Sequence, residues 1–273
     1  MPAPSLLRAT FVHLPGIGPT TEVELWRRGV LDWSELRSLA TSGHAPPRVH
    51  PGLDHALAGS ETALAGGEVA WFARRLPERE QWRLYPTFRD RTAFLDIETT
   101  SLSPYEGIVT VVTVHGAGAT RSFVAGENLE ELPAYLRHFG LLVTFNGSRF
   151  DVPFLEATFP QFVAPPVHID LRFLLYRLGH AGGLKRIEAR LGLGDRTGVE
   201  GVDGLQAVRL WQEFRRGNAA ALDRLVRYNR ADTTNLEPLL ELAVRELSAR
   251  LPLPPVPSSA PVAAAVARPD ADR

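Results

Sequence analysis

From residue 92 onward the sequence changes from helical patterning to short apolar runs separated by turn residues. Runs such as TAFLDI and IVTVVTVHG are rich in β-branched and aromatic residues, which favour strands. Three such runs come first, and helices and strands then alternate, an order typical of an α/β fold with a mixed sheet flanked by helices. The predicted strands cover residues 92–97, 108–116, 121–125, 141–146 and 167–171. The predicted helices of this part cover residues 127–139, 151–159, 171–178, 184–191, 204–215 and 219–248.

The chain is predicted to contain four parts, of which the α/β domain over 92–250 is the largest. Residues 1–43 predict a small helical region, in which turn glycines separate two short amphipathic segments. Residues 44–91 predict a Pro/Gly-rich linker followed by helical patterning over 54–75 and a connector rich in arginine and aromatic residues. Residues 251–273 are rich in proline and alanine, a composition that predicts a disordered tail.

Two acidic residues, Asp96 and Glu98, interrupt the first strand of the α/β domain. Residues two apart on a strand project from the same face. Two carboxylates on one face of a buried strand are electrostatically costly unless cations lie nearby. The alternative is a strand end with two solvated acids, and the apolar run FLDI around Asp96 favours the strand interior.

Further acidic residues follow the later elements. Asp151 opens a predicted helix, where it can serve as an N-cap, and Asn146 can either hold substrate or favour the turn. Tyr228 and Asp232 are four residues apart on a helix and therefore share a face. A phenol beside a carboxylate can orient or deprotonate a water held by a metal ion. The alternative for this pair is an amphipathic helix with a buried tyrosine and an exposed acid.

Taken in order, these clusters resemble the three motifs of the ribonuclease-H-like 3′–5′ exonucleases of the DnaQ/DEDD superfamily. DIETT is similar to the first motif, NGSRFD to the second and YNRAD to the third. The tyrosine of YNRAD is typical of the DEDDy branch, and the chain also resembles the bacterial YprB-like proteins. The resemblance covers about residues 10–250 and is strongest over 92–236. It implies a ribonuclease-H-like mixed sheet in the α/β domain.

The resemblance also implies roles for individual residues. Asp96, Glu98, Asp151 and Asp232 would bind two Mg²⁺ or Mn²⁺ ions, and Tyr228 would position the attacking water. Two such ions, about 4 Å apart, stabilise the attacking and leaving oxygens of a phosphodiester. The terminal nucleotide would lie against Thr99, Thr100 and Leu102. Ser101 departs from the glycine that the family often has there, which leaves the ligand set intact.

Two further positions near the motifs have competing interpretations. Asp170 lies at a predicted strand end and is either an acid behind the metal ligands or a cap for the following helix. Lys185, the only lysine of the chain, begins a helix in GGLKRIEARLG, where phosphate could meet backbone N–H groups. The family shows a similar GGLK run, so Lys185 is predicted to bind substrate. Arg186 is equally consistent with a solvated helix face.

The N-terminal helical region resembles a helix-hairpin-helix, a motif whose glycine-rich turn offers backbone N–H groups to nucleic-acid phosphate. Gly16 and Gly18 in LPGIG would be the phosphate contacts. Many such hairpins only pack against their neighbours, so contact with nucleic acid is one of two interpretations. Residues 74–91 combine arginines with Trp82, Tyr85 and Phe88, a composition that either binds single strands or forms a packed connector, which we favour.

Composition limits the remaining possibilities. The formal net charge of the chain is -1, so any nucleic-acid site must be local. The chain has no cysteine, which excludes disulfides, thiolate metal sites and cysteine nucleophiles. No signal-peptide pattern or membrane-length apolar run is present, so we expect a cytoplasmic protein that does not contact a membrane.

We therefore expect a metal-dependent 3′–5′ exonuclease that acts on single-stranded DNA or RNA ends. Two alternatives stay open at this point. The first is a nucleic-acid-binding protein with an inactive ribonuclease-H-like domain. The second is a structure-specific endonuclease of the same fold. The four acids and the tyrosine of the three motifs argue against the first alternative, and Tyr228 argues against the second.

Overall fold

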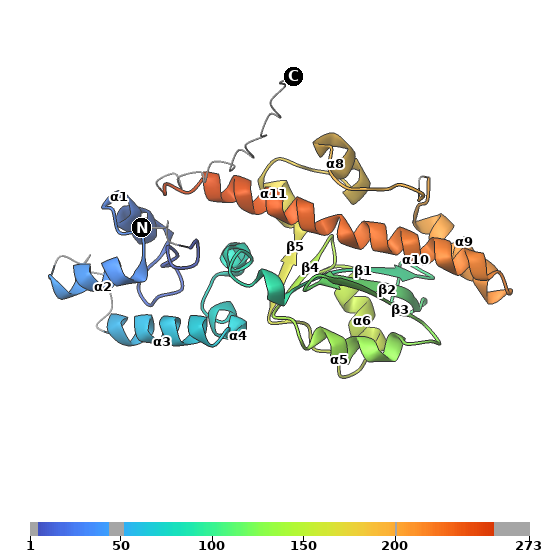
Figure 1. Ribbon diagram of the computed structural model, residues 1–273, viewed down its shortest axis with the longest axis horizontal. Helices are drawn as coiled ribbons and strands as arrows, with labels where there is room; N and C mark the ends of the chain where they lie inside the picture. The colour runs from blue at the N-terminus through green and yellow to red at the C-terminus, as the bar shows by residue number, and fades with distance from the viewer. Residues whose placement is uncertain (1–4, 44–51, 200, 254–273) are drawn as a thin grey trace, which may run out of the picture.

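A computed structural model describes residues 5–43, 52–199 and 201–253. Five strands form one mixed sheet in the order β3-β2-β1-β4-β5 (Figure 1). The strands are β1 (Thr92–Thr99), β2 (Val109–Gly116), β3 (Ala119–Val124), β4 (Leu141–Thr144) and β5 (Val167–Asp170). The first three strands pair antiparallel, whereas β4 and β5 run parallel to β1. This sheet and the helices on its faces confirm the predicted α/β, ribonuclease-H-like fold.

The middle strand, β1, has apolar side chains on one face and acidic side chains on the other. Leu95 and Ile97 pack with the apolar side chains of two helices, α5 (Leu132–Leu136) and α6 (Asp151–Thr158). The alternate residues Asp96 and Glu98 point to the other face, because side chains alternate along a strand. The sheet is therefore buried on both sides, and the two acids of β1 lie inside the molecule rather than at an exposed strand end.

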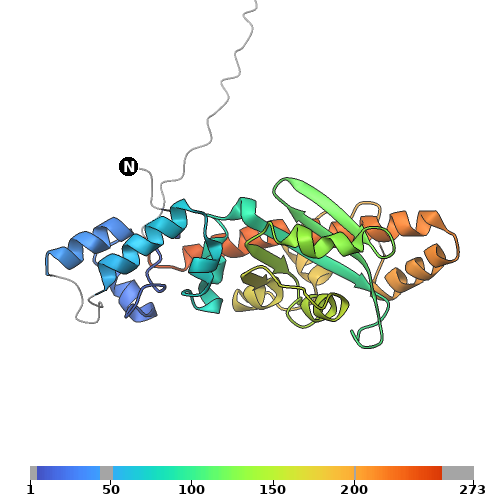
Figure 2. The same cartoon turned by 90° about the horizontal axis from the view of Figure 1, so that it is seen from below.

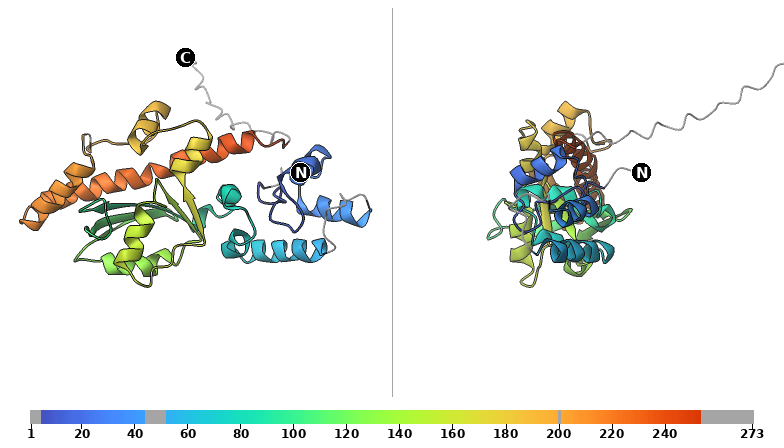
Figure 3. Two further views of the ribbon diagram at one scale, coloured as in Figure 1. Left: turned by 180° about the vertical axis from the view of Figure 1, so that it is seen from behind. Right: turned by 90° about the vertical axis from the view of Figure 1, so that its left-hand side faces the viewer.

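Two antiparallel helices, α9 (Gly204–Arg215) and α10 (Ala219–Thr234), cover the second face next to β1 and β2. They form a hairpin at one end of the elongated molecule (Figure 2). The predicted helix over 219–248 is two helices, since α10 ends at Thr234 and α11 (Leu236–Ala249) begins two residues later. From behind, α10 and α11 follow one another along the length of the molecule (Figure 3). The remaining helices of this part are α7 (Leu171–Arg177) and α8 (Leu184–Leu191).

The N-terminal region is helical, as predicted, and begins with turns rather than a helix. Residues 6–9 and 12–13 form turns, and the first helix starts only after the LPGIG segment. The helices are α1 (Pro19–Arg27), α2 (Trp33–Thr41), α3 (Leu53–Ala65) and α4 (Val69–Ala73). The helical pattern predicted over 54–75 is broken at Gly66 and Gly67, because Gly67 has the positive φ that favours glycine.

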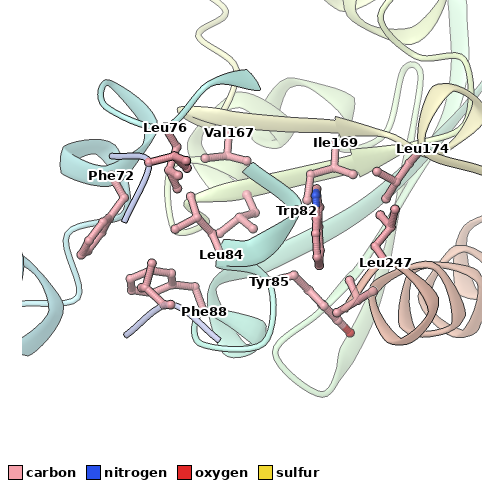
Figure 4. Packing of buried hydrophobic residues seen from close by; sticks show 14 of the residues in the cluster. Phe72, Leu76, Trp82, Leu84, Tyr85, Phe88, Val167, Ile169, Leu174 and Leu247 are labelled. Carbon is pink, nitrogen blue, oxygen red and sulfur yellow. The ribbon is translucent and has the colours of Figure 1, made fainter. Parts of the chain in front are cut away.

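The arginine- and aromatic-rich connector folds into two short 3-10 helices, η1 (Glu78–Leu84) and η2 (Arg89–Arg91). Its aromatic side chains Trp82, Tyr85 and Phe88 are at most 5% exposed. Figure 4 shows them packed among residues of β5, α7 and α11. The packed-connector interpretation is therefore right, because rings buried in this way have no free face on which a base could stack.

One apolar core runs from the N-terminal helices through the connector to β4, β5 and α11. A buried ion pair lies within it, between Glu22 of α1 and Arg83 of η1, at 2.9 Å. Glu22 also accepts hydrogen bonds from the backbone N–H groups of Phe11 and Val12. A single carboxylate thus joins the N-terminal turns, α1 and the connector.

Two structural expectations concern residues that the structure does not describe in full. Most of the Pro/Gly linker, residues 44–51, and most of the predicted disordered tail, residues 254–273, lie outside the described residues.

The predicted helix over 127–139 is shorter in the structure: a 3-10 turn, η3 (Leu129–Glu131), leads into α5 with Pro133 in its first turn. Among the described helices, none has the length and apolar character needed to cross a membrane.

Candidate metal centre

The centre is built on β1 and on α10, the helix that packs against the face of the sheet at β1. Residues Leu225, Tyr228, Asn229 and Asp232 are all buried, and their spacing of three and four residues places them on one face of α10. That face meets the side of β1 from which Asp96 and Glu98 project. Asn229 Nδ2 donates a 2.8 Å hydrogen bond to Asp96 Oδ2 and so connects the helix to the strand.

Three carboxylates converge at this crossing. Asp96, Glu98 and Asp232 each offer an oxygen atom, and these oxygens all lie within 4.8 Å of one another. Glu98 and Asp232 are buried, whereas Asp96 retains partial exposure, so the cluster is open to solvent on one side. Hard oxygen ligands at this separation suit Mg²⁺ or Mn²⁺. The residues present therefore fit a divalent metal ion.

The electrostatics of the cluster also favour a bound cation. Burial, together with the neighbouring carboxylates, raises the pKa of Asp96 well above its ordinary value. Burial and the charge of Asp232 likewise raise the pKa of Glu98, and the charge of Lys185 opposes this rise. Charged carboxylates that are crowded and desolvated cost free energy, and a divalent cation would offset that cost.

Asp151 lies beside the cluster without joining it. The residue is buried at the start of α6, and the backbone N–H of Ile97, between the two acids of β1, is a hydrogen-bond donor to its carboxylate. Burial and the charge of Asp170 raise the pKa of Asp151 to about 7 against these backbone hydrogen bonds. Its charge adds to the pKa rise of Asp96 and of Glu98. A direct ligand role for Asp151 remains a prediction.

The turn before Asp151 explains how that side chain is positioned. Asn146 adopts a positive φ of 66°, and Gly147 approaches Thr144 so closely that a Cβ at 147 would lie 2.2 Å from Oγ1 of Thr144. Asp170 holds this turn by accepting hydrogen bonds from the N–H groups of Asn146 and Ser148. It also caps α7 through the N–H of Arg172. Asp170 is therefore both a helix cap and a support behind Asp151.

Tyr228 lies in the cluster as a neutral phenol. Burial, followed by the charge of Asp232, raises the pKa of Tyr228 above its ordinary value of 10.0. Lys185 Nζ lies 4.5 Å from the centre of the Tyr228 ring, in a cation–π contact. Lys185 also donates a short hydrogen bond to the carbonyl of Val202. The lysine that was predicted to bind substrate therefore lies at the site, and its ammonium group already contacts Val202 and Tyr228.

The residues predicted to bind the terminal nucleotide differ in their availability. Thr99 Oγ1 donates to the Ser101 carbonyl, and Thr100 Oγ1 accepts from the Ile108 N–H, so both hydroxyls close the base of the β1–β2 loop. Leu102 in that loop is 87% exposed. The Asn146 side-chain oxygen accepts a 2.6 Å hydrogen bond from Arg172, which favours its turn role. Of these four side chains, Leu102 is the most accessible.

The other predicted phosphate contacts, Gly16 and Gly18, lie in the N-terminal region, at the opposite end of the molecule from α9 (Figure 1). Gly16 has a φ of 79°, and Gly18 is the N-cap of α1 without a side-chain cap. Both glycines are exposed. Their contact with nucleic acid remains a prediction.

Three residues of the site were not predicted from the sequence. Asn229 binds Asp96, as described above. Arg196, in the loop after α8, lies 2.6 Å from Asp232 Oδ1 and donates a 2.6 Å hydrogen bond from Nε to Glu188 Oε2. Glu188 of α8 is 3% exposed. Asn229 follows Tyr228 within the third motif, so its place in the site could have been predicted from the sequence. Glu188 and Arg196 lie outside the three motifs, and no sequence pattern marks them.

The raised pKa of Asp151 predicts a pH-dependent stability. A carboxyl whose pKa rises from 3.8 to about 7 on folding contributes stability that is present at low pH and is lost as the pH rises to about 7. In metal-free buffer, Asp151→Asn should therefore become more stable relative to wild type between about pH 5 and about pH 8. Thermal melts at both pH values measure this difference. Asp223→Asn, at an exposed position of α10, is the control, and parallel profiles for Asp151→Asn and wild type would contradict the prediction.

No curated protein matches the sequence. Among solved structures, the family B DNA polymerase of Pyrobaculum calidifontis aligns with a TM-score of 0.47 and 17% identity over 55% of this chain, which spans 24% of the polymerase. Brucella melitensis NrnC with bound Mg²⁺ aligns with a TM-score of 0.40 and 20% identity, over 60% of this chain and 78% of NrnC. The Aedes aegypti Nibbler EXO domain aligns with a TM-score of 0.42 and 12% identity, over 63% and 87%.

At these identities and TM-scores the solved structures do not assign an activity to the chain. The match to a family model is more extensive. The model of the RNase H superfamily aligns with residues 93–244, which is more than half of the chain and includes Asp96, Glu98, Asp151, Tyr228 and Asp232. The protein therefore belongs to the RNase H superfamily.

Proposed function

We propose that this protein is a metal-dependent 3′–5′ exonuclease that hydrolyses phosphodiester bonds at single-stranded nucleic-acid ends. The main support is the convergence of Asp96, Glu98 and Asp232 on one point, with the Tyr228 phenol beside Asp232. Asp96, Glu98 and Asp232 would hold divalent Mg²⁺ or Mn²⁺, and Asp151 lies close enough to influence the charge of that site. Two such ions would stabilise the charge that develops on the attacking and leaving oxygens.

Tyr228 has a restricted role in this proposal. In the metal-free protein, burial and the charge of Asp232 raise the pKa of Tyr228, so the phenol keeps its proton at neutral pH. It can donate or accept a hydrogen bond and so orient a water molecule next to Asp232. We therefore assign Tyr228 the positioning of a reactant.

One surface next to the cluster supports a nucleic-acid substrate. The β1–β2 loop, which begins after Thr99, exposes Leu102 and Tyr105, the latter at 95%. These two side chains offer a surface against which an unpaired terminal base could stack.

The proposal is tested with 5′-labelled single-stranded oligonucleotides and Mn²⁺. An exonuclease of this polarity produces a ladder that shortens one nucleotide at a time from the 3′ end, and a chemically blocked 3′ end stops it. A circular single strand should stay intact. Cleavage of the circle would indicate the endonuclease alternative, and tight binding without any hydrolysis would indicate an inactive nucleic-acid-binding protein.

Replacing the Tyr228 hydroxyl should slow the reaction without removing it. We expect Tyr228→Phe to lower kcat by about 10²-fold with little change in KM, because the loss affects the orientation of water rather than the binding of the nucleotide. Steady-state kinetics on the same oligonucleotide measure both constants. Tyr176→Phe, at an exposed position of α7, is the control. A variant of Tyr228 with wild-type kcat would remove the tyrosine from the mechanism.

A further inference from the structure

Arg196 lies at the edge of the metal centre and contacts two carboxylates. Its Nε donates to Glu188 of α8, and its Nη1 lies 2.6 Å from Asp232 Oδ1 of α10 as an ion pair. The residue thus joins a helix outside the three motifs to one of the cluster carboxylates. Lys185 is another basic side chain at this acidic site.

The surroundings of Arg196 hold it in place. Glu188 is buried, and Arg196 is its only ion-pair partner within the described residues. Departure of Arg196 would leave a buried unpaired carboxylate, which is strongly destabilising. The loop is fixed on its other side because the Asp195 N–H donates to Asn235 Oδ1 and Asn235 Nδ2 donates to the Asp195 carbonyl. Gly194, with a φ of 89°, allows the close approach of Asn235.

The guanidinium nevertheless has one unused end. Nη1 is occupied by the contact with Asp232, whereas Nη2 is buried and has no hydrogen-bond acceptor in the described chain. Buried polar groups in native proteins are nearly always hydrogen-bonded, so Nη2 requires an acceptor. The acceptor must also tolerate the neighbouring carboxylates. A phosphate oxygen bound with the divalent ions satisfies these conditions, because it accepts a strong charge-assisted hydrogen bond from a single guanidinium N–H.

We propose that Arg196 binds a non-bridging oxygen of the substrate phosphate beside the acidic cluster, as a fixed positive charge oriented by Glu188. This inference rests on the proposed function for the identity of the substrate. Arg196 would then complement the divalent ions at the phosphate, and it would do so in a position that the protein determines before substrate arrives. The competing role is a purely structural one, in which Arg196 only orients Asp232.

Binding of a phosphate-bearing nucleotide distinguishes the two roles without use of catalytic activity. Calorimetric titration at constant Mn²⁺ would compare deoxyadenosine 5′-monophosphate with deoxyadenosine, and the ratio of their affinities measures what the phosphate contributes. Arg196→Gln should reduce this ratio by about 10- to 100-fold, the usual range for loss of a charge-assisted hydrogen bond. Arg196→Lys keeps the charge next to Glu188 and should give an intermediate ratio. Arg190→Gln, at an exposed position of α8, should leave the ratio unchanged.

Several outcomes would overturn the inference. One is an unchanged ratio in Arg196→Gln, including the case in which that variant binds Mn²⁺ more weakly, since this is the behaviour of a structural role. Another is a wild-type protein that does not prefer the monophosphate. If Arg196→Gln fails to fold, an unchanged ratio in Arg196→Lys has the same meaning. The protein could also prefer the monophosphate through Arg196 and yet fail to digest oligonucleotides. That result would contradict the proposed function and would still support this inference.

Discussion

Asp96→Asn should abolish nearly all hydrolysis while making the metal-free protein more stable. Asp96 is a member of the three-carboxylate cluster, so its loss removes a metal ligand, and we expect the rate to fall by about 10³-fold or more. In metal-free buffer the same change removes a buried charge that is repelled by Asp232, Asp151 and Glu98. Relief of that repulsion should raise Tm by roughly 2–4 °C for each kcal/mol gained.

The opposite signs of these two effects make the test specific. A substitution that inactivates an enzyme by damaging the fold lowers Tm, whereas Asp96→Asn should raise it in EDTA and lose the increase in Tm that Mn²⁺ produces in wild type. Asp90→Asn is a matched control, because Asp90 is exposed just before β1. Retention of full activity in Asp96→Asn would refute the metal centre as the site of hydrolysis.

Glu22→Ala should destabilise the protein by about 3–5 kcal/mol, the usual cost of removing one partner of a buried ion pair. Glu22 is 1% exposed, pairs with Arg83 and accepts hydrogen bonds from the N–H groups of Phe11 and Val12. Without the carboxylate, the two N–H groups lose their acceptor, and Arg83 is left with its ion pair to the less buried Glu80. Urea titration followed by tryptophan fluorescence measures the change in the free energy of unfolding.

Glu24→Ala provides the control on the same helix. Glu24 is exposed, so its replacement should change stability by no more than about 0.5 kcal/mol. A Glu22→Ala variant that unfolds at the wild-type urea concentration would contradict the role assigned to this ion pair. Because one apolar core extends from α1 to α11, we expect a single unfolding transition for wild type.

The strands and the paired acids of the site could be predicted because their signals are local. The apolar run around Asp96 predicts a strand, and strand geometry alone places Asp96 and Glu98 on one face. Helix geometry in the same way places Tyr228 and Asp232 together. The structure has both pairs as expected, and it brings Asp96, Glu98 and Asp232 together because α10 crosses the face of β1.

Other features depend on contacts between distant segments, which no local pattern reports. The connector aromatics Trp82, Tyr85 and Phe88 have a composition suited to single-strand binding, but packing against β5, α7 and α11 buries them. Arg196 meets Asp232 from a loop 36 residues earlier in the chain, and its spacing follows no helix or strand period.

The α/β order, the pairing of acids on β1 and on α10, and the likeness to a nuclease family were all readable from the order of the residues. These follow from backbone periodicity, which acts over a few residues. Three features became visible only in the folded chain: which acids converge, that Asp170 supports the turn before Asp151, and that Glu188 and Asp232 share one arginine. Burial and Coulomb interactions depend on distances in space, and the packing of helices on the sheet sets those distances.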